Sequence, residues 1–200
     1  MKRILKPLAA FVLAACSNAA TTPPTPALAP VASFQDLMVA VVDPSADGVW
    51  EAVGAETDAS GHHEHAPRTD AEWAAVRQHA VRLVESAHLL LVPGRPIVAP
   101  GAKVEDAHIP GVNDAAAIQR AFAADPDAFT AAVQRLHGAA TAALQAVDRR
   151  DTAAVLAAGQ ALEQACEACH RRYWYPNSPP PPAPALGPAI PVTATPKGSR

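Results

Sequence analysis

Cysteine is scarce in this chain, which has only three cysteines, Cys16, Cys166 and Cys169, among its 200 residues. So few cysteines exclude the disulfide framework of a small secreted scaffold, and the single close pair excludes a site built from two cysteine pairs. Aromatic residues make up only 4% of the chain, glycine contributes 10 residues, and apolar residues rarely alternate with polar ones. The chain therefore lacks the pattern of a sheet protein, and its many alanines and its apolar residues at helical spacing favour helices.

The close pair of cysteines belongs to the run Cys166-Glu167-Ala168-Cys169-His170. Cys-x-x-Cys-His is the attachment signature of a c-type haem. On a helix, residues at i, i+3 and i+4 share one face, so the two thiols and the imidazole can meet the same flat macrocycle. The motif predicts one covalent haem c, with thioethers from Cys166 and Cys169 and with His170 left to bind the iron.

The first fifteen residues have the order of a secretory signal peptide. Residues 1–6 are cationic and residues 7–15 are small and apolar, which is too short for a retained membrane-spanning helix. The segment ends in Leu13-Ala14-Ala15-Cys16, which resembles the lipobox of bacterial lipoproteins. This resemblance implies cleavage before Cys16, lipidation of Cys16 and a lipid anchor on the periplasmic side of a bacterial membrane, with Ser17 slightly favouring the outer membrane. An ordinary signal peptide cleaved nearby is the alternative.

These assignments use every cysteine of the chain. If Cys16 is acylated and the other two form thioethers, no thiol remains for a disulfide. Cleavage would remove three of the 16 basic side chains (Lys2, Arg3 and Lys6), leaving 13 against 19 acidic ones and a formal charge of −6. Such an acidic protein is not expected to bind nucleic acid and is compatible with a basic redox partner protein.

Proline divides the chain into segments. Residues 16–30 form a lipidated, proline-rich tether, and residues 177–200 form a proline-rich tail; both are expected to be disordered. The remaining residues, 31–176, have the size of one domain.

Within this domain, apolar residues recur at helical spacing. The first stripe begins at Phe34, and Asp43-Pro44 is expected to interrupt its helix because Pro44 has no amide hydrogen to donate. The helix is expected to resume through Val53, with Asp43 as N-cap and Pro44 at the first helical position. Further helices are predicted from about residue 70 to 92, from 125 onward and from about 151 to 173, with a short piece at 114–123, a polar loop at 54–68 and a long crossover at 93–113. Four amphipathic helices predict an all-α, antiparallel four-helix bundle.

A single Cys-x-x-Cys-His at the end of the last helix of an exported four-helix chain resembles the class II c-type cytochromes, the cytochrome c′ family. The resemblance implies that Cys166 and Cys169 hold the haem and that His170 is the proximal ligand. Tyr173 matches the aromatic residue that follows in this family, whereas Trp174 occupies a position that is usually basic. We expect Trp174 to cap the bundle or to cover the haem edge. Because class II relatives are often dimers, a homodimer is a further expectation.

The ligand on the other side of the iron decides the function. Met38 is the only methionine after the predicted signal peptide. It lies on the first helix, which supplies the sixth ligand in low-spin members of the resembled family. Because His/Met is the usual electron-transfer pair, we predict an electron carrier with Met38 as the distal ligand. If Met38 only fills the core, the iron is five-coordinate and the protein binds nitric oxide or carbon monoxide, as a gas sensor or scavenger.

Histidines provide competing distal ligands. His79 and His88 lie beside the apolar stripe of their helix rather than on it, and His137 belongs to the next long helix. Surface or helix-flank positions are the expectation for these three, with bis-histidine ligation as the alternative. His108 lies in the long crossover, where sequence does not place it.

The run Gly61-His62-His63-Glu64-His65 has the composition of a transition-metal site. Residues adjacent in sequence rarely reach one tetrahedral ion together, so a solvated loop is the expectation. A zinc site that combined Cys166 and Cys169 with two of these histidines, in a lipoprotein without haem, is the third alternative. No activated serine, further cysteine or pair of carboxylates indicates an enzyme.

Overall fold

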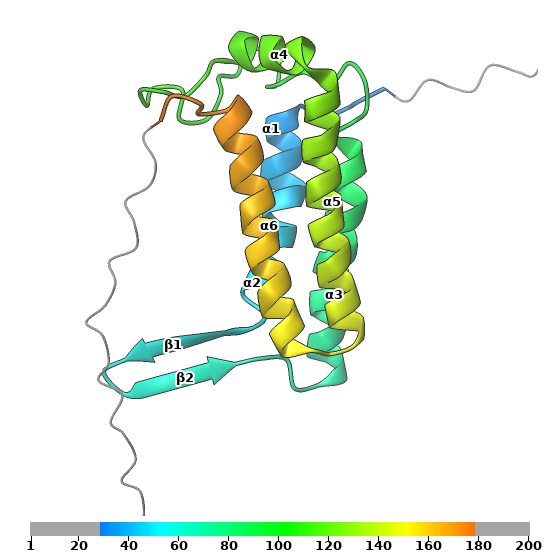
Figure 1. Ribbon diagram of the computed structural model, residues 1–200, viewed down its shortest axis with the longest axis vertical. Coiled ribbons are helices and arrows are strands. Elements are labelled where there is room, and N and C mark those ends of the chain that lie inside the picture. The colour runs from blue at the N-terminus through cyan, green and yellow to red at the C-terminus, as the bar shows by residue number, and fades with distance from the viewer. Residues whose placement is uncertain (1–28, 179–200) are drawn as a thin grey trace, which may run out of the picture.

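The protein is mostly helical in the computed structural model, which describes residues 29–178 (Figure 1). The elements in chain order are α1 (Phe34–Leu37), the π-helix η1 (Met38–Val42), α2 (Asp43–Trp50), β1 (Gly54–Asp58), β2 (Gly61–His65), α3 (Asp70–Leu89), α4 (Ala115–Ala124), α5 (Pro126–Asp148) and α6 (Thr152–Tyr173). The predicted helical class is confirmed. The described residues do not include the predicted signal peptide or Cys16. They also leave out the tether, apart from its last two residues, and residues 179–200 of the tail. Between residues 29 and 178, no helix combines the length and apolar character needed to cross a bilayer.

The helices begin where side-chain oxygens can accept hydrogen bonds from free backbone amides. The hydroxyl of Thr69 accepts from the amide of Glu72, and the Glu72 carboxylate accepts from the amide of Thr69, which forms a capping box before α3. The carboxylate of Asp125 accepts from the amide of Ala128 and so caps α5, and Pro126 occupies the first helical position, where its missing amide costs nothing.

The interruption predicted at Asp43-Pro44 is a π-turn and not a break in the helix, and the helix predicted to resume there is α2. The elements α1, η1 and α2 follow one another without a break from Phe34 to Trp50. In η1 the amide of Asp43 donates to the carbonyl of Met38, five residues earlier, in place of the usual four. This wider turn relieves the crowding that a proline ring causes against the preceding α-helical turn, so the helix accommodates Pro44 instead of stopping.

The predicted polar loop at 54–68 contains a β-hairpin, which is a second correction. Strands β1 and β2 are antiparallel, and their register pairs Gly54 with His65 and Asp58 with Gly61. The hairpin projects away from the helices (Figure 1), and all but its terminal glycines are exposed. Because neither face is buried, the sequence carries no alternation of apolar and polar residues, which is the signal that identifies most strands.

The long helices pack side by side and successive ones run in opposite directions (Figure 1). Helix α5 packs against α3 and α6, and α2 packs against the same two helices. Small and branched apolar side chains fill the interior; those with almost no exposed surface include Val49, Leu83, Ile118, Leu136, Val147, Val155 and Leu162. At one end of the helices, four aromatic rings pack together with centroids 4.2–5.9 Å apart: Phe34, Phe122, Phe129 and Tyr173.

The long crossover between α3 and α4 forms hydrogen bonds with the start of the first helix. The guanidinium of Arg95, which is only 8% exposed, donates to the carbonyl oxygens of Ala32 at 2.6 Å and Leu89 at 2.9 Å. The amide of Phe34 also donates to the carbonyl of Pro96 at 2.8 Å. Because these bonds join the crossover to residues 32–34, they position the helix that carries Met38.

Glycine allows the close approach of α2 and α3. An added Cβ at Gly48 would lie 2.3 Å from Cγ of His79, whose Nδ1 is 3.1 Å from the Pro44 carbonyl oxygen. Gly138 in α5 has open space around it. We expect Gly138→Ala to stabilise the protein by up to about 1 kcal/mol through helix propensity. Gly48→Ala should be less favourable than this control by about 1–3 kcal/mol because the histidine must be displaced. Urea unfolding of both variants would test this, and equal free energies of unfolding would contradict the packing.

Candidate haem site

The three residues of the predicted haem motif lie in the last turns of α6 and share one cavity with Met38. Cys166, Cys169 and His170 come to this cavity together because they are spaced at i, i+3 and i+4 on a helix. Met38 reaches it from the facing helix, at the first position of η1. The other lining residues are mainly apolar. They include residues of α1, η1, α4 and α5 and the residue that follows α3: Phe34, Val42, Leu90, Phe122, Phe129, Ala132, Val133 and Leu136.

Two neighbouring hollows make up the site. The inner cavity, which the cysteines line, has a volume of about 40 Å³, and an outer groove next to it has about 330 Å³. Four residues line both hollows: Met38, Asp43, His170 and Trp174. A flat macrocycle between Met38 and His170 therefore requires the lining side chains to move apart, chiefly in the inner cavity.

Burial sets the protonation states at this site. It raises the pKa of the Cys166 and Cys169 thiols to about 11, because a thiolate is poorly solvated among apolar side chains. Burial also lowers the pKa of His170, which keeps the imidazole neutral near pH 7. A neutral imidazole is the form that binds iron. Two thiols, a neutral imidazole and an apolar lining fit a covalently attached haem.

Because the cysteine side chains are half-buried among apolar groups, their thiols should react slowly in the apoprotein. At pH 8, a pKa of about 11 in place of 9.0 leaves about a hundredfold less thiolate, which is the reactive form. We expect iodoacetamide to modify Cys166 and Cys169 of haem-free Cys16→Ser protein about 100-fold more slowly in buffer than in urea. Peptide mass spectrometry over time measures both rates, and equal rates would show that the thiols are not buried.

The aromatic residues after the motif divide between the site and the core. Trp174 lines both hollows, as expected for a residue that covers the haem edge, and Tyr175 lines the outer groove. The Tyr175 hydroxyl donates to Glu167 at 2.5 Å; burial, followed by this bond, raises the pKa of Tyr175. Tyr173 turns inward, where it packs edge-on against Phe122. The Tyr173 side chain therefore supports the end of α6 from inside the protein.

Sequence reasoning missed Asp43. This residue lines both hollows beside His170, and its amide donates to the Met38 carbonyl. Although Asp43 is exposed overall, partial removal of water from its carboxyl raises its pKa, while attraction to His170 lowers it by a smaller amount. Five residues separate Met38 and Asp43, which places them about 140° apart on an ideal α-helix. Only the wider π-turn brings both to the same site.

The competing histidines lie elsewhere. His79 bonds to Pro44, and the His88 and His137 rings stack with centroids 4.2 Å apart. In the described part of the chain, His170 is the only imidazole that lines the inner cavity. The hairpin histidines lie at the opposite end of the helices from the C-terminal turns of α6 (Figure 1). The structure therefore does not combine them with the cysteines in a zinc site.

A mostly helical protein whose last helix presents two thiols and an imidazole to an apolar cavity has the fold and the site expected of a helical haem protein. Comparison with known families agrees with this class. Residues 99–174, from the crossover through the Cys-x-x-Cys-His motif, match the family model of cytochrome C′. This match, over 76 of the 200 residues, supports assignment to the class II c-type cytochromes, the cytochrome c′ family, and that family implies a haem cofactor. The match does not include the segment that carries Met38. No curated protein and no solved structure matched the chain.

Proposed function

We propose that this protein is an electron carrier of the bacterial cell envelope that holds one covalent haem c with His170 and Met38 as axial ligands. The observation that carries the proposal is that Met38 and His170, from facing helices, line the same two hollows. A neutral imidazole and a thioether on opposite sides of the iron form the ligand pair typical of electron transfer.

Each side chain has a distinct task in this proposal. The thiols of Cys166 and Cys169 would each add S–H across a haem vinyl group, forming a C–S bond and transferring hydrogen to the other carbon, without an oxidant. His170 would hold the iron from α6, and the Met38 thioether would favour its reduced form. The apolar lining excludes water and so influences the potential. When bound, the haem supplies reversible one-electron redox chemistry.

The cellular setting of the proposal rests on the sequence. Cleavage before Cys16 and its lipidation would tether a four-helix haem domain, residues 31–176, to the periplasmic side of a membrane, with the outer membrane slightly favoured. The acidic charge left after cleavage supports a basic redox partner. Association into homodimers is a further proposal, based on the family.

Gas binding is the second candidate function, and the lining of the inner cavity favours it in one respect. Phe34, Val42 and Leu90 surround Met38 with apolar surface. If the methionine were displaced, this surface would leave a site for a small neutral gas at the iron. Cytochrome c′ family membership is compatible with either electron transfer or gas binding.

Optical spectra separate the two functions. We expect protein made with haem-attachment machinery to give a low-spin ferric spectrum with a Met–Fe charge-transfer band, and its ferrous form to bind carbon monoxide slowly or weakly. A high-spin ferric spectrum with ready carbon monoxide binding would contradict the electron-carrier function and support gas binding. A colourless protein with titratable thiols would show that the protein does not carry haem.

A further inference from the structure

The two faces of the β-hairpin carry different side chains. In an antiparallel pair, directly opposed residues point to the same face, and alternate residues along a strand share that face. The register pairs Glu56 with His63 and Gly54 with His65. One face, here called the two-histidine face, therefore carries Glu56, Asp58, His63 and His65. The opposite face carries Ala55, Thr57, His62 and Glu64.

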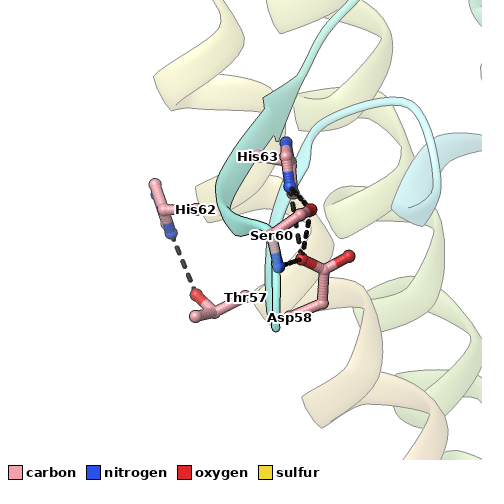
Figure 2. Close-up of polar contacts among 5 residues, drawn as sticks. All are labelled: Thr57, Asp58, Ser60, His62 and His63. Carbon is pink, nitrogen blue, oxygen red and sulfur yellow. Dashed lines mark hydrogen bonds and ion pairs between the residues drawn. The ribbon is translucent and has the colours of Figure 1, made fainter.

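The side-chain contacts agree with this division (Figure 2). On the two-histidine face, Nε2 of His63 lies 2.8 Å from the Ser60 hydroxyl and 3.4 Å from a carboxylate oxygen of Asp58. On the opposite face, Nδ1 of His62 lies 3.1 Å from the Thr57 hydroxyl. Adjacent histidines thus point away from each other, whereas His63 and His65 point the same way.

The composition and charge of the two-histidine face suit a cation. Gly54 lies opposite His65, and a Cβ at this glycine would come within 2.7 Å of the His65 ring. The imidazole of His65 therefore lies over the backbone of Gly54, in a position that a side chain at residue 54 would block. Residues 54–65 contain three carboxylates and no lysine or arginine. Imidazole and carboxylate donors without thiolates suit divalent zinc and copper.

We propose that the two-histidine face binds a divalent transition-metal ion of the zinc and copper type through the imidazoles of His63 and His65 and the carboxylate of Glu56. Glu56 lies directly across from His63, where cross-strand Cβ atoms are about 4.5–5.5 Å apart. Asp58 adds negative charge beside His63. Within residues 29–178, no three such side chains already converge on one point, so binding requires these exposed side chains to rotate inward.

Metal binding would also stabilise the hairpin. An isolated two-stranded hairpin is marginally stable in water, and this one projects from the helices without packing against them (Figure 1). An ion held by Glu56 from β1 and by His63 and His65 from β2 would link the two strands. Binding should therefore slow hydrogen exchange of the hairpin amides while leaving that of α5 unchanged.

Zinc titration of the ferric, full-length protein in a calorimeter tests the site. Glu56→Gln, His63→Ala and His65→Ala should each weaken binding by at least about tenfold, since even loss of a group that supports a metal ligand costs about that much. His62→Ala and Glu64→Gln, on the opposite face, are matched controls and should change the affinity less than about threefold. All five positions are exposed, so none of the substitutions removes core packing.

The pattern across the variants decides the outcome. Equal weakening by His62→Ala and His63→Ala, or full binding in a His63→Ala/His65→Ala variant, would mean an adventitious ion only and would overturn the proposal. The result of this test does not depend on whether the protein carries haem. If haem were absent and the thiols bound zinc, that binding would persist in every hairpin variant and disappear in Cys166→Ala/Cys169→Ala.

Discussion

Replacing Met38 with alanine is expected to change the ferric haem from low-spin to high-spin and to remove the Met–Fe charge-transfer band. Met38 lines both hollows together with His170, so its loss removes the thioether that the proposal places opposite the imidazole. Because a thioether favours reduced iron, the reduction potential should fall by on the order of 100 mV. Carbon monoxide should also bind the ferrous variant more readily, because the sixth position is open.

The neighbouring residue provides the control for this experiment. Val39 is 57% exposed and lines the outer groove but not the inner cavity. Val39→Ala should therefore keep the low-spin spectrum and shift the potential only slightly. Spectroelectrochemical titration measures both variants under the same conditions. If the unsubstituted protein and Met38→Ala share one spectrum and one potential, Met38 is a core residue and the gas-binding function is favoured.

Removing both motif cysteines is expected to abolish covalent haem. Cys166 and Cys169 line the cavity from the same helix as His170 and supply the two thioether sulfurs of the proposal. The double variant Cys166→Ala/Cys169→Ala should lose haem staining after denaturing electrophoresis, and its polypeptide mass should lack the added haem. His170 remains in this variant, so haem that still binds would be removed by denaturation and acid extraction.

Substitution of the third cysteine, Cys16, tests lipidation independently of haem attachment. Cys16→Ser should keep the full haem stain in the mature chain but lose the lipid, and the protein should move from the membrane to the soluble fraction. Haem staining that persists in Cys166→Ala/Cys169→Ala would contradict attachment through this motif. A Cys16→Ser protein that remains in the membrane fraction would contradict the lipoprotein proposal while leaving the haem assignment intact.

The helices that carry the site could be predicted because their signals are local. Apolar spacing identified the interior face of α3, α5 and α6, and the helix starts predicted at about residue 70 and at residue 125 agree with the caps at Thr69 and Asp125. The shared face of Cys166, Cys169 and His170 followed from the helical repeat alone. These features depend on residues a few positions apart, so the rest of the chain was not needed to find them.

Sequence reasoning failed where distant or unusual contacts decide the conformation. Asp43-Pro44 predicts a break in the helix, but a π-turn keeps the helix continuous and brings Asp43 to the site. The crossover contains no periodic pattern, yet Arg95 fastens it to Ala32. Neither feature has a sequence signal, because a π-turn depends on packing around the helix and the buried arginine depends on a carbonyl oxygen from a distant segment.

The sequence by itself determined the chemistry of this protein: a helical chain with two thiols and an imidazole on one helical face, which predicts a haem protein. The tertiary structure decided what faces that chemistry. Helix packing brings Met38 to the same cavity as His170, and the register of the hairpin places His62 on one face and His63 with His65 on the other. Spacing along one helix fixes neighbours within it, whereas the approach of two helices or two strands depends on the packing of the whole chain.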